Sequence, residues 1–149
     1  MLPGPQRCID ILMVEDNQGD AELASEAFAN ACLSNRLKVV EDGEQALNYL
    51  RRQPPFDEAT RPDLVLLDVN LPGLGGLEVL RIIKDDQTLC QIPVVMLSSS
   101  SARRDIELAY QRHANCYVQK PMSFDRYVEV VQALQGFWAG VVTLPTHRD

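Results

Sequence analysis

Histidine and basic side chains are scarce in this chain. It has 149 residues but only 2 histidines, His113 and His147, which lie too far apart for a histidine metal site. Lys and Arg together number 14 against 21 Asp and Glu, so the formal net charge is −7. The adjacent basic residues Arg103 and Arg104 are isolated, as on a solvated helix face. This charge balance argues against a nucleic-acid-binding surface, and we expect no nucleic-acid partner.

Long apolar runs and closely spaced cysteines are also lacking. No apolar run approaches the ~18 residues that suggest a membrane-spanning helix, so we expect no membrane span. The four cysteines are scattered, without a Cys-x-x-Cys motif: Cys8, Cys32, Cys90 and Cys116. Residues 1–5 lack the charged and apolar regions of a signal peptide. These absences favour reduced thiols and a cytoplasmic location over disulfides or structural zinc.

One carboxylate stands out because of the segment that precedes it. Residues 64–67 are a continuous apolar run that leads directly into Asp68, and a turn follows. Such a run between turn signals is typical of a strand buried on both faces. In an open parallel sheet, ligands bind outside the carboxyl ends of the strands, where Asp68 would lie. The alternative is an aspartate that caps the next helix, but Leu71, Pro72 and Gly73 leave no helix start within its reach.

Apolar segments alternate with stretches of helical periodicity along the whole chain. We expect strands at 8–14, 37–40, 64–67, 92–97 and 116–118, and helices at 20–33, 44–52, 77–84, 105–114 and 124–134. Asn17 or Asp20 is expected to cap the first helix, and Ser123 the last. This alternation predicts a doubly wound α/β fold, a parallel sheet with helices on both faces. The flavodoxin-like strand order 2-1-3-4-5 is the common solution for five strands.

The chain is expected to form one domain with two short flanking segments. The domain covers residues 8–136, a Pro/Gly leader precedes it at 1–7, and an apolar extension follows at 137–149, too short for an output domain. The extension contains Phe137, Trp138 and Val141, which are costly to expose together. They either fold back on their own domain or form the interface of a homodimer with the last two helices and fifth strand. We favour the symmetric dimer.

Polar side chains follow four of the five predicted strands. They are Glu15 and Asp16 after the first strand, Asp68 after the third, Ser98 after the fourth and Lys120 after the fifth. In the expected topology these ends meet at one cleft. Crowded carboxylates need a positive partner, which either Mg²⁺ or the Lys120 ammonium supplies. A carboxylate beside both is a competent nucleophile toward phosphorus, so the pattern predicts an aspartyl-phosphate site.

This ordered set of strand-end residues resembles the receiver domain of two-component response regulators. The matching segments are 11–17, 62–72, 92–98 and 114–121, and the likeness extends over about residues 8–134. Within the family, the chain is most similar to stand-alone regulators paired with bacterial phytochrome-type sensor histidine kinases. That narrower similarity rests on residues 17–21, 68–72 and 114–117 and on Phe137 and Trp138.

The resemblance implies a role for each acidic position. Asp68 would accept a phosphoryl group from a kinase phosphohistidine. Asp16, Asp68 and the backbone carbonyl of Asn70 would bind Mg²⁺, with Mn²⁺ as a substitute. Glu15 would act on the metal through a water.

The resemblance also implies a switch and a set of partners. Lys120 would pair with the phosphoryl group, Ser98 would swing toward it, and Tyr117 would rotate inward as Ser98 moves. The first partner would be a sensor histidine kinase, for which a bacterial phytochrome is the candidate. The other partners would be a second copy of the chain and a downstream protein that the sequence does not identify. The chain would catalyse only its own phosphorylation and dephosphorylation.

Two other classes of function fit the sequence less well. A Mg²⁺-dependent phosphohydrolase with an aspartyl nucleophile would need a second acid two residues after it, where Asn70 stands, and a substrate-covering cap. A pseudo-receiver that only docks other proteins would not need the complete set of polar strand-end residues. Turnover of a small phosphomonoester would identify the hydrolase.

Overall fold

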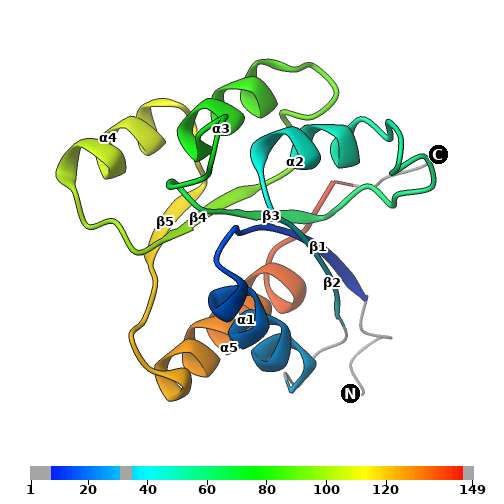
Figure 1. Cartoon of the computed structure of the whole chain (residues 1–149). Coiled ribbons are helices and arrows are strands. Elements are labelled where there is room, and N and C mark those ends of the chain that lie inside the picture. The colour runs from blue at the N-terminus through cyan, green and yellow to red at the C-terminus, as the bar shows by residue number, and fades with distance from the viewer. Residues whose placement is uncertain (1–7, 31–34, 146–149) are drawn as a thin grey trace.

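The protein folds as one five-stranded parallel sheet with five helices, seen in a computed structural model that describes residues 8–30 and 35–145. The elements are β1 (Ile9–Val14), α1 (Gln18–Ala29), β2 (Asn35–Val40), α2 (Gly43–Leu50), β3 (Leu64–Leu67), α3 (Gly76–Asp85), β4 (Val94–Ser98), α4 (Arg103–Gln111), β5 (Cys116–Gln119) and α5 (Phe124–Gly140). The strand order is β2-β1-β3-β4-β5, as Figure 1 shows. The predicted doubly wound fold of order 2-1-3-4-5 is confirmed.

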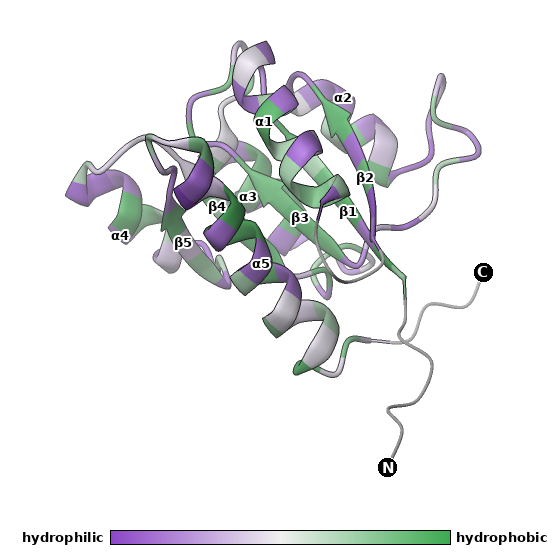
Figure 2. Ribbon diagram, turned by 90° about the horizontal axis from the view of Figure 1, so that it is seen from below, coloured by the Kyte–Doolittle hydropathy of each residue, from purple (hydrophilic) through white to green (hydrophobic). Residues whose placement is uncertain are grey.

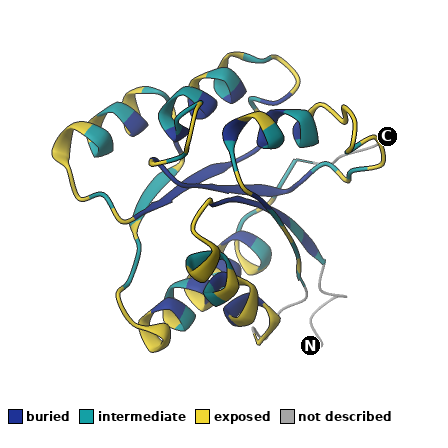
Figure 3. Cartoon of the chain, viewed as in Figure 1, coloured by how far each residue is buried: buried dark blue, intermediate teal, exposed yellow. Residues whose placement is uncertain are grey.

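Helices cover both faces of the sheet. Helices α1 and α5 lie on one face, and α2, α3 and α4 lie on the other (Figure 1). Alternate strand residues face opposite layers: Val65 packs with the α2–α4 layer, whereas Leu64 and Leu66 pack with α1 and α5. All four residues of β3 are buried, and the inner strands β1, β3 and β4 form the buried centre of the molecule in Figure 3.

The colouring by hydropathy follows the same division. In Figure 2, β3 is hydrophobic along its length and β1 is hydrophobic apart from Asp10, whereas the helices alternate between hydrophobic and hydrophilic residues. Helix α3, for example, buries Val79, Leu80 and Ile83 and exposes Arg81. This is the amphipathic pattern of a helix that packs on a sheet.

The register of the sheet aligns the strand ends that matter for the site. Val14 at the end of β1 pairs with Val40 of β2 and with Leu67 of β3. The next residues along β1 and β3, Glu15 and Asp68, therefore lie side by side just beyond the paired strands.

The first residue of a helix depends on its N-cap, which the spacing of apolar residues does not identify. Helix α1 begins at Gln18, two residues earlier than predicted, because Asn17 is the cap and its Oδ1 accepts a hydrogen bond from the Asp20 amide at 2.9 Å. Ser123 caps α5 as predicted, with 3.3 Å between its Oγ and the Arg126 amide. The predicted last turn of the first helix (31–33, with Cys32), the leader at 1–7 and residues 146–149 lie outside the described residues.

The last helix continues beyond the expected limit of the domain. Because α5 ends at Gly140, residue 136 lies within a helix rather than before a tail. Trp138 is 8% exposed and packs in the α1–α5 core, whereas Phe137 and Val141 are 52% and 73% exposed. The rings of Phe137 and Trp138 meet edge to face with centroids 5.4 Å apart. The end of α5 thus combines a buried tryptophan with exposed apolar neighbours.

The described cysteines and the lengths of the helices complete the description of the fold. Cys8, Cys90 and Cys116 are free thiols. Among the helices of the described residues, none is both long enough and apolar enough to cross a membrane.

Candidate functional site

Backbone hydrogen bonds place three of the predicted site residues just beyond the strand ends. The Glu15 amide donates to the last residue of β2 at 2.9 Å, and the Asp68 amide donates to the last residue of β1 at 3.2 Å. The Lys120 amide donates to the last residue of β4 at 2.8 Å. The positions of all three residues are therefore fixed by the sheet itself.

Lys120 is the centre of the charge arrangement. Its Nζ lies 2.9 Å from Asp68 Oδ2 and 3.1 Å from Asp20 Oδ2, and it forms a third ion pair with Glu15. The lysine side chain is 6% exposed. An ammonium has three N–H donors, so these carboxylates can occupy all of them. A lysine this buried needs such partners, because an unpaired charge away from water is costly.

Burial and ion pairing change the proton affinities of this cluster. Burial raises the pKa of Glu15 from 4.5 to about 7, although its hydrogen bond with Lys120 acts in the opposite direction. Burial alone would lower the pKa of Lys120, but the carboxylates of Glu15 and Asp68 outweigh it and raise that pKa above its ordinary value. Lys120 therefore remains a cation at neutral pH.

Three carboxylates converge closely enough to share a cation. Glu15, Asp16 and Asp68 each offer an oxygen, and these oxygens lie within 4.8 Å of one another. Asp16 is exposed, whereas the other two are buried. Asn70 lies two residues after Asp68 and is exposed, and its amide donates a hydrogen bond to Asp68 Oδ1 at 3.3 Å. Hard oxygen donors with solvent access on one side suit Mg²⁺ or Mn²⁺, which keep several waters.

The loop after Asp68 folds back against the phosphoacceptor candidate. The Gly76 amide donates to the Val69 carbonyl at 3.0 Å. A Cβ at Gly76 would lie 1.8 Å from the Asp68 carbonyl oxygen, far inside contact distance. Only glycine fits here, and the start of α3 thereby supports the backbone of Asp68.

Ser98 and Tyr117 meet at one residue of the β4–α4 loop. The Ser98 hydroxyl, which is fully buried, accepts a hydrogen bond from the Ser100 amide at 3.2 Å. The Tyr117 hydroxyl donates to the Ser100 carbonyl at 2.8 Å. The Ser100 hydroxyl also lies 2.6 Å from Asp105 Oδ2 in the first turn of α4. Movement of Ser98 would thus act on the residue that holds Tyr117 and α4.

The sequence did not reveal two residues of this neighbourhood. Asp20 was considered only as a helix cap, yet it pairs with Lys120. An acid in the first turn of the helix after Glu15 and Asp16 was the available signal. Tyr127 of α5 has a buried hydroxyl without a hydrogen-bond partner among the described residues, and burial raises the pKa of that hydroxyl above its ordinary value.

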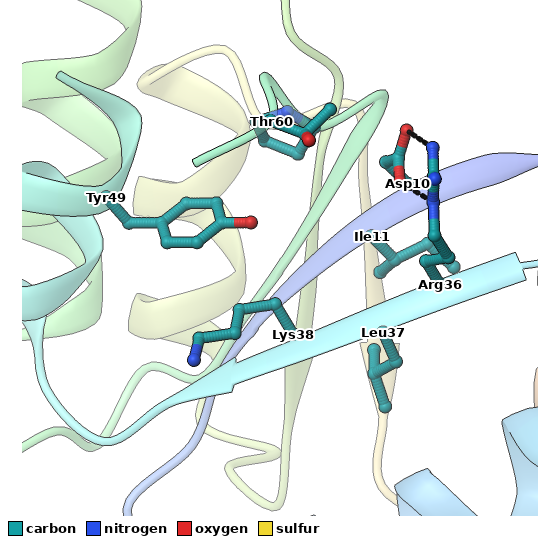
Figure 4. Close-up of a pocket in the computed structure, with 8 residues that line it drawn as sticks. Asp10, Ile11, Arg36, Leu37, Lys38, Tyr49 and Thr60 are labelled. Atoms are coloured by element: carbon teal, nitrogen blue, oxygen red, sulfur yellow. Dashed lines mark hydrogen bonds and ion pairs between the residues drawn. The ribbon is translucent and has the colours of Figure 1, made fainter. Parts of the chain in front are cut away.

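A small hollow of about 150 Å³ lies elsewhere, at the opposite end of the sheet. In Figure 4, Asp10 of β1 pairs with Arg36 of β2, and the Tyr49 ring reaches toward the hollow from α2. Asp10 is near the start of β1 and Thr60 precedes β3, so the hollow is at the amino-terminal ends of these strands. It is separate from Asp68, which follows a carboxyl-terminal end.

An apolar hollow of about 550 Å³ lies between β5 and α5. Its lining is Asn115, Cys116, Val118, Val130, Ala133, Leu134, Phe137 and Trp138. Two of the three predicted interface residues therefore line one concave surface, and the third, Val141, follows on the exposed end of the helix.

Comparisons with known proteins agree with this geometry. Residues 11–132 match the family described as the response regulator receiver domain. The chain is 38% identical to response regulator Rcp1 of Synechocystis over 91% of its own length and 92% of that protein. Rcp1 has also been solved in a Mn²⁺-bound form, with a TM-score of 0.86 and 37% identity over 93% of this chain and 99% of that one.

Two other solved structures are similar over nearly the whole chain. The phosphorylated cyanobacterial phytochrome response regulator RcpA has a TM-score of 0.89 and 42% identity, covering 94% of this chain and all 100% of that chain. RPA3017, a response regulator in red light signalling of R. palustris, has a TM-score of 0.87 and 37% identity over 93% of this chain and 99% of that one. With its strand-end lysine and carboxylates, this chain belongs to the response regulator receiver domain family.

Proposed function

We propose that Asp68 is the residue of this receiver domain that accepts the phosphoryl group. The observation that carries the proposal is the Lys120 ammonium 2.9 Å from Asp68 Oδ2, beside carboxylates able to share a cation. An Asp68 oxygen would form the new P–O bond while the P–N bond to a kinase histidine breaks and the imidazole keeps the bonding pair. Lys120 would hold its positive charge against the transferred group.

The acidic cluster is proposed to bind Mg²⁺, with Mn²⁺ as a substitute. Asp16, Asp68 and the backbone carbonyl of Asn70 would be direct ligands, and Glu15 would act through a water. When bound, the cation neutralises charge on the phosphoryl oxygens. The Mn²⁺-bound form of Rcp1 supports this choice of metal.

Ser98 and Tyr117 are proposed to convert the chemistry into a change of surface. The Ser98 hydroxyl would turn to a phosphoryl oxygen and give up its bond from the Ser100 amide. Because the Ser100 carbonyl accepts from Tyr117, this exchange would bias the position of the tyrosine and of α4. A local charge event would thus select between two arrangements of the loop.

The donor is proposed to be a sensor histidine kinase, and specifically a bacterial phytochrome. The names of RcpA and RPA3017 connect these similar proteins to phytochrome and red light signalling. The free thiols of Cys8, Cys90 and Cys116 favour the cytoplasm as the place of exchange. The signal would pass to a downstream protein, and we expect no turnover of a separate substrate.

A homodimer through the end of α5 is the second part of the proposal. Phe137 and Val141 are exposed although apolar, and Phe137 and Trp138 line the hollow against β5. Trp138 is already covered by its own domain, so a second copy of the chain would cover Phe137 and Val141. An isologous interface is the common arrangement.

The phosphoacceptor proposal is tested by incubation with acetyl phosphate and measurement of the intact mass. We expect a gain of one phosphoryl group that requires Mg²⁺ and is lost in Asp68→Asn. Binding of beryllofluoride, measured in parallel, detects an acceptor whose phosphoryl group hydrolyses quickly. If the wild-type protein shows neither the mass gain nor beryllofluoride binding, the proposal is wrong.

A further inference from the structure

We propose that Asp20 is a positioning residue that holds the Lys120 ammonium, from helix α1, in the orientation needed for phosphoryl transfer. The Lys120 Nζ lies 3.1 Å from Asp20 Oδ2, across 100 residues of sequence. The inference rests on the proposed transfer to Asp68 and adds α1 to the elements that build the site.

The arrangement of the three partners indicates what Asp20 contributes. Glu15 and Asp68 follow β1 and β3, so two of the three carboxylates on Lys120 come from the sheet. A lysine side chain has four rotatable bonds and loses much conformational entropy when it is fixed. The third contact, from α1, restrains the ammonium against rotation away from the sheet.

Asp20 is itself held in place by its neighbours. Asn17 Oδ1 accepts from the Asp20 amide at 2.9 Å, and the Asn17 amide donates to Glu15 Oε2 at 3.2 Å. Asn17 therefore connects the Glu15 carboxylate to the backbone of Asp20, and both residues bind Lys120. The three residues form a frame in which a shift of Asp20 relative to Glu15 is resisted by hydrogen bonds.

Asp20 should affect the rate of phosphorylation in two opposite ways, through its charge and through its contact with Lys120. The direction in which the rate changes in a variant therefore shows which effect is larger. As a negative charge, Asp20 should slow the approach of an anionic phosphoryl donor, so its neutralisation alone should speed the reaction. As a positioning residue, it should speed the reaction, because small misplacements of a catalytic group are costly. A slower Asp20→Asn variant would therefore report positioning and not charge.

The test compares initial rates of phosphorylation by acetyl phosphate at saturating Mg²⁺. We expect Asp20→Asn to lower the rate at saturating donor about tenfold, as for the loss of one charge-assisted hydrogen bond. The donor concentration for half-maximal rate should change little, and Asp20→Glu should recover part of the rate. The matched control is Glu22→Gln, which removes the same charge from an exposed position of α1 and should not slow the reaction.

A double-mutant cycle separates action through Lys120 from other causes. In a Lys120→Ala background, Asp20→Asn should no longer slow the reaction, because the group that it positions is gone and only the effect of the lost negative charge remains. In an otherwise native chain, Asp20→Asn should also raise the rate at which acetic anhydride labels Lys120, a readout that needs no phosphoryl transfer.

Three results would overturn the inference. The first is an Asp20→Asn rate equal to or above that of the wild type, and the second is an equal penalty in the Lys120→Ala background. The third is unchanged labelling of Lys120. A wild-type protein that takes no phosphoryl group would instead contradict the proposed function, and this inference with it.

Discussion

Three carboxylates of the site have the buried Lys120 ammonium as their common ion-pair partner. Lys120 is the shared partner of Glu15, Asp20 and Asp68, and the first and last of these are buried as well. A buried ion pair adds little net stability compared with an apolar pair, but removal of one partner leaves an uncompensated charge. The stability of the protein should therefore respond strongly to a change at Lys120.

We predict that Lys120→Ala lowers the free energy of unfolding by about 3 kcal/mol without metal, and that Mg²⁺ restores part of the loss. Urea denaturation with and without Mg²⁺ measures both effects. Arg103→Ala is the control, since its ion pair with Glu107 is exposed and should contribute no more than about 0.5 kcal/mol. Equal effects of the two variants would contradict the prediction.

Glu15 should give the metal-free protein a distinctive pH dependence. Its pKa is about 7 in the folded protein against an ordinary value of 4.5, so the folded state binds more protons than the unfolded state between these pH values. The free energy of unfolding should therefore fall as the pH rises from about 4.5 to 7. In Glu15→Gln this contribution is absent, and the difference between the two pH profiles, measured in a chelator, isolates it. A flat difference would show that Glu15 keeps its ordinary pKa.

Among the elements, the central strand was easier to predict from the sequence than the ends of the other strands and of the helices. Strand β2 begins at Asn35 instead of residue 37, and β4 begins at Val94 instead of residue 92. The run at 64–67 gave β3 without error because a strand buried on both faces is apolar throughout. Helix α1 began two residues early because its start depends on the side chain of Asn17, which periodicity does not weigh. The residues after 136 were expected as a tail, yet α5 continues to Gly140 because one side of that turn still packs on the core.

The start of α3 should be intolerant of any side chain at Gly76. We predict that Gly76→Ala lowers the free energy of unfolding by about 3 kcal/mol, because the added Cβ would meet the Asp68 carbonyl and force the backbone to shift. Gly136→Ala is the matched control within α5, where a Cβ meets nothing within 4 Å. That variant should gain up to about 1 kcal/mol from helix propensity. Thermal or urea denaturation compares the two, and similar stabilities would rule out the close contact.

For the whole molecule, topology explains why the predicted site residues come together. The order β2-β1-β3-β4-β5 brings the carboxyl ends of β1 and β3 side by side, so Glu15, Asp16 and Asp68 converge as the strand pattern predicts. The contact between Asp20 and Lys120 could not be predicted this way. It depends on the angle at which α1 leaves the sheet and on the length of the lysine side chain, and neither is encoded in strand order.

The proposed dimer should be lost when charges are placed at the end of α5. We expect the wild-type chain to sediment as a dimer at tens of micromolar, and Phe137→Asp with Val141→Asp to sediment as a monomer, because charges would be buried in the interface. Met122→Asp is the control, since Met122 is fully exposed at the other end of α5. Sedimentation equilibrium with and without beryllofluoride provides the measurement. A wild-type monomer under both conditions would exclude the dimer.

The phosphoryl group can be located directly on the chain. After phosphorylation with acetyl phosphate and Mg²⁺, reduction with borohydride converts an acyl phosphate into an alcohol, which peptide mass spectrometry then places in the sequence. We predict that the reduced residue is Asp68 and that the other carboxylates of the site remain unreduced. Reduction at Asp16 or Asp20 with Asp68 intact would show that Asp68 is not the phosphoacceptor.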